Sequence, residues 1–347
     1  MAESNTEYRQ FKKKVLYIVR VVALVIILLL LLKEVFSVLL LLLAGTLVAM
    51  YFRGLAGIFE RHTKMSQGAA LSISIIGSFL LLAGFFYIAG NSIQQQIDQI
   101  KETFPPAVEN ARASLSKSSL GRSILEKLED GNNDQRLMNV AQSFFRSTFG
   151  IIGDIYIVLF IAIFFTVSPK PYTTGMVKLF PSSGKPVARE VIEKVGYTLK
   201  RWLKGQIFAM LVVFVLTSIA LIIMGIPMWL VLALFAGLLN FIPNIGPLIA
   251  MIPAVIIGFL QGPVTAIVVA CVYILIQTLE SSLITPQIQK KMIKVPPALI
   301  IIAQLFMGVL TGGWGLLLAT PLMVIIMVLV QELHIKKMKQ QEEAASS

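Results

Sequence analysis

Two polar runs in the most apolar part of the chain carry the residues that could do chemistry. The first extends from Asn240 to Pro247 and combines two asparagines with two prolines and a glycine. Proline lacks a backbone donor and clashes with the preceding helical turn, so a helix must break here. Peptide groups freed inside a membrane are tolerated where they are buried in protein or line a polar cavity. We expect either the wall of a transport path or a kinked packing corner, formed by Asn240, Pro243, Asn244, Gly246 and Pro247.

The second run lies between Gln277 and Pro286. Gln277, Glu280 and Ser281 are three and four positions apart, which places them on one helical face. An ionisable group within an apolar segment is costly and indicates a functional site. Glu280 could therefore accept a proton or a cation, or it could pair with Lys290 or Lys291 in the next loop. The candidate residues of this run are Gln277, Glu280, Ser281, Thr285 and Pro286.

Two further features complete the predicted transport path. Asp154 is the other acid within an apolar run. It could serve as an auxiliary acid, extend to the outer surface, or pair with Arg146. Gly312 and Gly313 join two apolar runs and predict a turn that shifts during transport.

No catalytic or metal-binding set accompanies these residues. His62 and His334 are the only histidines and lie in basic loops, while Cys271 is the only cysteine and lies in an apolar run. We therefore expect no metal site based on histidine or cysteine. The chain also lacks the Gly-rich lysine motif that cradles nucleotide phosphates. We expect no enzyme, no cofactor and no ATP-driven pump, so transport is either passive or driven by a gradient.

The composition predicts the elements that must hold these residues. Of 347 residues, 56% are apolar and 14% are charged, whereas soluble domains are about 25% charged. Several continuous apolar runs reach the roughly 20 residues that cross a bilayer as a helix. We expect an all-α polytopic membrane protein with about eight transmembrane helices and exclude a soluble enzyme.

The positions of lysine and arginine predict the orientation, because short cytoplasmic loops are enriched in both. Residues 1–90 form a cytoplasmic tail and three spans, the first retained rather than cleaved and joined to the second by a tight hairpin at Lys33–Glu34. Residues 91–148 have balanced charge and form an external helical loop, and residues 149–168 form the fourth span. Both termini are expected in the cytoplasm.

The segment 169–204 carries eight basic and two acidic side chains and predicts a cytoplasmic amphipathic helix, lying on the inner leaflet or against the bundle. Its position favours lipid headgroups over nucleic acid as the partner. Its apolar stripe consists of Val187, Val191, Val195, Leu199 and Trp202.

Residues 205–331 form a C-terminal transport region with broken helices, and residues 332–347 form a cytoplasmic tail. Within this region, residues 228–260 would measure about 50 Å as one helix, too long for a single span. We expect a re-entrant hairpin here, split at Pro243 and entered from outside.

The motifs of this region have a characteristic order and spacing. They are Gly205-Gln206, Gly225-Ile226-Pro227, Asn240 to Pro247, Gln277 to Pro286, Pro296-Pro297, Gly312-Gly313, Gly315 and Ala319-Thr320-Pro321. In these motifs residues 200–331 resemble the autoinducer-2 exporter (AI-2E) family, and the layout of the whole chain is similar. The resemblance implies a transport protein of the bacterial cytoplasmic membrane that could assemble as a homo-oligomer. It also implies export of the quorum-sensing signal autoinducer-2 or, as in other members, sodium/proton antiport.

Three functions remain open at this point. The first is a secondary transporter that exports a small polar solute, since a wall of Asn, Gln, Ser and Thr suits an uncharged, hydroxyl-rich cargo. The second is a monovalent cation (sodium)/proton antiporter that uses Glu280, with Asp154 as its auxiliary acid. The third is a non-transporting membrane scaffold whose external and basic loops bind partners.

Overall fold

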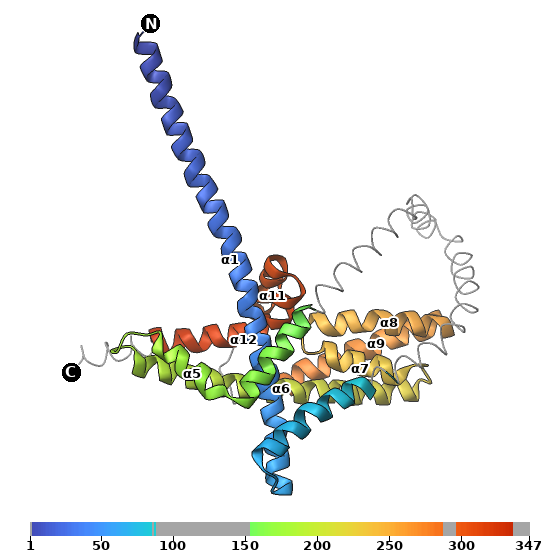
Figure 1. Cartoon of the computed structure of the whole chain (residues 1–347). Coiled ribbons are helices and arrows are strands. Elements are labelled where there is room, and N and C mark those ends of the chain that lie inside the picture. The colour runs from blue at the N-terminus through green and yellow to red at the C-terminus, as the bar shows by residue number, and fades with distance from the viewer. Residues whose placement is uncertain (1, 85–86, 88–152, 287–295, 336–347) are drawn as a thin grey trace, which may run out of the picture.

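The computed structural model describes residues 2–84, 87, 153–286 and 296–335, and every regular element within them is a helix (Figure 1). Two helices, at Gln67–Gly84 and Gly153–Val167, precede the C-terminal region. The other elements are α1 (Ala2–Thr63), α5 (Pro169–Lys178), α6 (Lys185–Ile223), α7 (Trp229–Leu239), α8 (Ile245–Gln261), α9 (Pro263–Leu279), η1 (Glu280–Ile284), α11 (Pro297–Thr311), α12 (Gly313–Val330) and η2 (Gln331–Ile335).

The all-α polytopic architecture is confirmed. Five helices in the described part of the chain are long and apolar enough to cross a membrane, and a sixth span is counted if the helix Gly153–Val167 and α5 form one bent pair. The difference from the predicted number arises from the shorter apolar helices α7, α8 and α11 and from α1, which joins two predicted spans. The whole predicted external loop, residues 91–148, lies outside the described residues, as do Lys290 and Lys291. Arg146, the proposed partner of Asp154, belongs to this loop.

The predicted hairpin at Lys33–Glu34 is wrong, because α1 continues through both residues for 62 positions. A tight turn needs a residue that breaks the helix, and residues 6–44 contain no Gly, Pro, Asn or Asp. Lysine and glutamate are good helix formers, so two charges alone do not end a helix. The hydroxyl of Ser37 donates to the carbonyl of Lys33 at 3.2 Å, one turn back along the same helix.

Helix α6 joins two segments that the sequence predicts as separate. Residues 185–204 of the amphipathic segment and the following span form one helix of 39 residues, whereas α5 is separate. Of the predicted apolar stripe, Val191, Leu199 and Trp202 are buried, whereas Val187 is 49% exposed. The C-terminal part of the stripe therefore packs against the bundle.

Two hydrophobic clusters meet along α6. The α1–α12 cluster contains Leu40, Ala44, Leu47, Val158, Leu199, Trp202, Leu203, Met307, Leu318, Ala319 and Val324. The α7–α9 cluster contains Val213, Leu221, Ile226, Leu232, Ala236, Ala250, Ala254, Ile257, Val269, Tyr273 and Ile276. In Figure 1, α7, α8 and α9 lie side by side, and the N-terminal part of α1 extends away from the other helices. Each half of α6 thus belongs to a different cluster.

The end of α6 is fixed by a Schellman turn. The N–H of Ile226 donates to the carbonyl of Leu221, and the N–H of Gly225 donates to the carbonyl of Ile222. Gly225 has a φ of +64°, which glycine adopts without strain. Ile226 and Leu221 are both buried in the α7–α9 cluster, which provides the apolar contact that accompanies this motif.

The predicted helix breaks are confirmed. Residues 240–244 separate α7 from α8, and Gly312, with a φ of +65°, separates α11 from α12. Helix α7 has 11 residues and α8 has 17, which correspond to about 16 Å and 26 Å. Each is shorter than a hydrocarbon core of about 30 Å. The re-entrant path of this hairpin remains a prediction.

The continuous course of α1 can be tested with spin labels at Tyr17 and Leu39, after replacement of Cys271 by alanine. Both positions are exposed. In one helix, 22 residues separate the two backbone sites by about 33 Å. A hairpin at Lys33 would bring the sites within about 20 Å, given helix axes about 10 Å apart. We expect the longer distance in double electron–electron resonance.

A label pair at Tyr17 and Leu31 serves as the control, because both sites precede Lys33 and are about 21 Å apart in either arrangement. A short distance for the test pair beside an unchanged control distance would contradict the continuous helix.

Candidate functional site

The turn between α7 and α8 is a strained γ-turn centred on Asn244. Asn244 has φ +67° and ψ −47°. The N–H of Ile245 donates to the carbonyl of Pro243 at 2.8 Å, across this single residue. Asparagine tolerates positive φ better than most side chains. Strained backbone of this kind is concentrated at functional sites, so the turn is a candidate site.

Gly246 lets α8 start directly against the end of α7. A Cβ atom at this position would overlap the carbonyl oxygen and carbon of Leu239. Gly246 and Pro247 are both buried, whereas Asn244 is exposed. The start of α8 is therefore closely packed, while the tip of the turn is open.

Two glutamines from other helices satisfy the carbonyl groups of this turn. Gln206 of α6 donates its Nε2–H to the carbonyl of Asn240 at 2.7 Å, and Gln304 of α11 donates to the carbonyl of Pro243 at 2.9 Å. Neither glutamine belongs to the predicted site. Each is an uncharged polar side chain within an apolar run, and that property is the signal that could have identified them.

The same group leaves one donor and one acceptor unused. Asn240 is 1% exposed and Gln304 is 0% exposed, and neither Asn240 Nδ2 nor Gln304 Oε1 has a hydrogen-bond partner among the described residues. An unpaired buried polar group costs about 1–3 kcal/mol. These two atoms offer what a hydroxyl group needs, since a hydroxyl both accepts and donates.

Glu280 lies in a pocket of hydroxyl and amide groups at the end of α9. Its side chain is buried, and the hydroxyl of Thr285 donates to its Oε1 at 2.7 Å. The π-helical turn η1 places Thr285 five residues later on the same side. Gln277 donates to Oε2 at 3.4 Å, and Ser281 donates its hydroxyl to the carbonyl of Gln277 at 2.8 Å. The structure thus brings Gln277, Glu280, Ser281 and Thr285 together, and Pro286 follows at the edge of the described range.

Asp154 contacts the start of α12 instead of extending away from the protein. The indole N–H of Trp314 donates to Asp154 Oδ2 at 2.7 Å. Trp314 follows Gly313, the first residue of α12, so this bond connects Asp154 to the Gly312–Gly313 turn. Trp314 does not belong to the predicted site, because sequence alone does not reveal a pair 160 positions apart.

The predicted residues fall into three separate groups. The first surrounds the turn 240–244, the second surrounds Glu280, and the third connects Asp154 to the Gly312 turn. Among the described residues, no hydrogen bond joins one group to another. Helix α6 packs against both α7 and η1, so the first two groups lie along the same helix. No cluster of three or more His, Cys, Asp or Glu that could hold a metal ion occurs in the described ranges.

The chain has recognisable relatives. The family model described as "AI-2E family transporter" matches residues 18–335. "Putative transport protein YueF" of Bacillus subtilis is 23% identical over 286 residues, which cover 81% of this chain and 69% of the relative. "AI-2 transport protein TqsA" of Escherichia coli is 21% identical over 78% of each chain. "Putative permease PerM" of Escherichia coli is 24% identical over 83% of this chain and 86% of the relative.

The close approach of Gly246 to Leu239 predicts that Gly246→Ala destabilises the protein. The added Cβ must push α8 away from α7, which costs about 1–3 kcal/mol of the free energy of unfolding. We expect a lower midpoint of thermal unfolding for the variant purified in detergent. Gly57→Ala in α1 is the control, because a Cβ there meets no atom within 4 Å. Equal midpoints for both variants would argue against the tight packing of this turn.

Proposed function

This chain belongs to the AI-2E family of transporters, and from that premise we propose that it exports a small, uncharged, polar solute of the autoinducer-2 type. The cargo crosses unchanged, without a catalytic step or a cofactor. The transporter lies in the cytoplasmic membrane of a bacterium, with its basic segment 169–204 and its C-terminus in the cytoplasm, and assembles as a homo-oligomer.

One observation carries the choice of cargo. The buried Nδ2 of Asn240 and Oε1 of Gln304 lack partners in the part of the chain that the structure describes, and both belong to residues at the broken hairpin. A charged cargo would need a countercharge, and the hairpin residues provide none. A hydroxyl-rich solute can satisfy both atoms without a charge, which supports an uncharged cargo.

The position of the turn between the two clusters supports a gating role. Phe241 packs against the α1–α12 cluster and lies edge-on to Trp202 with ring centroids 5.7 Å apart, whereas Leu239 packs against the α7–α9 cluster. A movement of one cluster against the other would strain the turn between these residues. Release of the glutamine bonds at Asn240 and Pro243 would then expose the amide groups to the cargo. The Gly312–Gly313 turn would provide the second hinge.

A second candidate function is sodium/proton antiport at Glu280. The observation that favours it is a buried carboxyl group that accepts hydrogen bonds from hydroxyl and amide groups and, among the described residues, has no basic partner. Such oxygen-rich surroundings suit either a proton or a sodium ion. Asp154 would serve as the auxiliary acid, held by Trp314.

The export function predicts that Asn240→Leu lowers the efflux of autoinducer-2 from loaded proteoliposomes about tenfold, which corresponds to about 1.4 kcal/mol for a lost hydrogen bond. Because Asn240 Nδ2 has no hydrogen-bond partner in the described ranges, leucine of similar size should leave the midpoint of thermal unfolding unchanged or raise it. Efflux is measured with and without an imposed proton gradient, so that coupling is tested in the same vesicles.

Gln261→Leu is the matched control for this variant. Gln261 also donates to a turn carbonyl, that of Gly225 at 3.0 Å, but it lies at the far end of α8. Efflux should therefore stay within twofold of the unchanged protein. Equal efflux by the Asn240 and Gln261 variants would contradict the proposal that the hairpin lines the transport path. An absence of efflux by the unchanged protein would reject this cargo.

Antiport makes a different prediction for Glu280→Gln. If Glu280 exchanges protons for sodium, sodium-dependent proton flux in vesicles that contain a pH-sensitive dye falls at least tenfold in the variant, because an amide cannot ionise. Glu60→Gln, a change of the same charge on α1 away from this group, should retain the flux. Antiport is rejected if the unchanged protein gives no more sodium-dependent flux than protein-free vesicles.

A further inference from the structure

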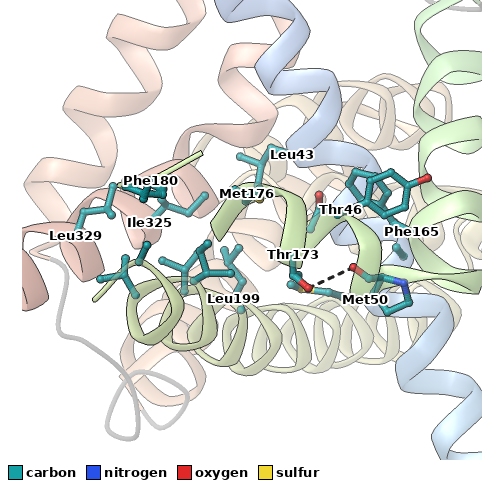
Figure 2. A pocket seen from close by; sticks show the side chains of 18 of the residues that line it. Leu43, Thr46, Met50, Phe165, Thr173, Met176, Phe180, Leu199, Ile325 and Leu329 are labelled. Carbon is teal, nitrogen blue, oxygen red and sulfur yellow. Dashed lines mark hydrogen bonds between the residues drawn. The ribbon is translucent and has the colours of Figure 1, made fainter. Parts of the chain in front are cut away.

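A cavity of about 810 Å³ lies between α1, the bend at Ser168–Pro169, α5, α6 and the end of α12 (Figure 2). Its volume is within the range of roughly 300–1,000 Å³ that is typical of sites for small molecules. None of the predicted path residues lines it. The cavity is therefore distinct from the proposed transport path.

The cavity wall is almost entirely apolar. Figure 2 shows Leu43, Met176, Leu199, Ile325 and Leu329 around the space. The hydroxyl groups of the two lining threonines are satisfied by their own helices: Thr46 donates to the carbonyl of Leu42 at 2.8 Å, and Thr173 donates to the carbonyls of Pro169 and Lys170. A wall of this kind suits a hydrocarbon chain and offers little to a sugar or a nucleotide.

One cation interrupts the apolar wall. Arg53 of α1 lines the cavity and donates its Nε–H to the carbonyl of Thr166 at 2.8 Å. This bond caps the last turn of the helix Gly153–Val167, which bends by 93° into α5 because Pro169 cannot continue the ladder. Arginine has five N–H donors, and within the described ranges no acidic side chain forms an ion pair with Arg53. Beside an apolar space, such a group favours an anionic partner.

The surroundings place this cation at the level of the inner leaflet. Residues 169–204, which form the α5 and α6 walls, carry eight basic and two acidic side chains. Within this segment, the sequence neighbours of lining residues include five basic residues, Lys170, Lys185, Arg189, Lys194 and Lys200, and two acidic ones, Glu190 and Glu193. Segments with such a charge excess lie on the cytoplasmic side, where the leaflet contains anionic lipids. The net positive charge of the segment that forms these two walls is thus complementary to a lipid phosphate.

We propose that this cavity is a binding site for an anionic phospholipid of the inner leaflet, with an acyl chain in the apolar space and the phosphate at Arg53. A phosphate accepts several hydrogen bonds from one guanidinium group, and the net positive charge of the segment 169–204 adds further attraction. Membrane lipid reaches such a site by lateral movement from the leaflet that surrounds it, without passage through water. The inference concerns a lipid site beside the transport path and does not depend on the identity of the cargo.

The test titrates the purified full-length chain, freed of lipid in detergent, with phosphatidylglycerol and with phosphatidylcholine of the same acyl chains. Native mass spectrometry measures the bound fraction. We expect one tightly bound phosphatidylglycerol per chain and at least tenfold weaker binding of phosphatidylcholine.

Gly196→Leu tests the apolar space. Gly196 lines the cavity within α6, and a Cβ there meets no atom within 4 Å, so leucine can fill the space without a backbone clash. Phosphatidylglycerol binding should fall at least tenfold. Gly175→Leu in α5 is the matched control, because its Cβ also meets open space and Gly175 does not line the cavity. Its binding should match that of the unchanged protein.

Arg53→Gln tests the anion site. The variant should bind both lipids equally, whereas Arg61→Gln, the same change at a position that does not line the cavity, should keep the preference for phosphatidylglycerol. Arg53→Lys, which keeps the positive charge, should retain part of the preference for phosphatidylglycerol. If Arg53→Gln does not fold, the Gly196 and Gly175 pair decides the question.

Three results would overturn the proposal. The first is equal binding of the two lipids by the unchanged protein, and the second is unaltered binding by Gly196→Leu. The third is binding of oleate without binding of phosphatidylglycerol, which would assign the cavity to a single-chain anion instead.

Discussion

A carbonyl group that has lost its helical partner inside an apolar environment needs a donor from elsewhere, and this constraint governs the interrupted helices of the protein. At the turn between α7 and α8 the donors are Gln206 and Gln304, from α6 and α11. At the end of the helix Gly153–Val167 the donor is Arg53 from α1. In each case the break is local, but the group that makes it tolerable comes from a distant part of the chain. The interrupted helices are therefore complete only when the whole bundle has packed.

Sequence reasoning succeeded where the cause is local. Pro243 ends a helix because of its own ring, and Gly312 supports a turn because it has no Cβ. The buried face of α6 follows from apolar spacing, and Val191, Leu199 and Trp202 are indeed buried. The group around Glu280 also follows from short spacing, since Thr285 is only five residues away.

Sequence reasoning failed where the cause is tertiary or where a charge resembles a break. Lys33 and Glu34 interrupt the hydropathy of α1 without interrupting its backbone. Trp314 and Asp154 are 160 positions apart, and Gln304 and Pro243 are 61 apart. No local pattern encodes such pairs. A search for isolated amides in apolar runs would have identified the two glutamines, but not the carbonyl groups that they serve.

The continuity of α6 has a mechanical consequence. A single rod of about 58 Å passes through both hydrophobic clusters and is attached to the hairpin turn near its middle, at Gln206. With that bond as a fulcrum, the arms measure about 32 Å and 26 Å. A tilt of about 5° would displace the two ends by between about 2 and 3 Å in opposite directions. A ligand or side chain that displaces one end of α6 would thus displace the other end in the opposite direction. The rigid helix itself would transmit this movement, without a series of side-chain rearrangements.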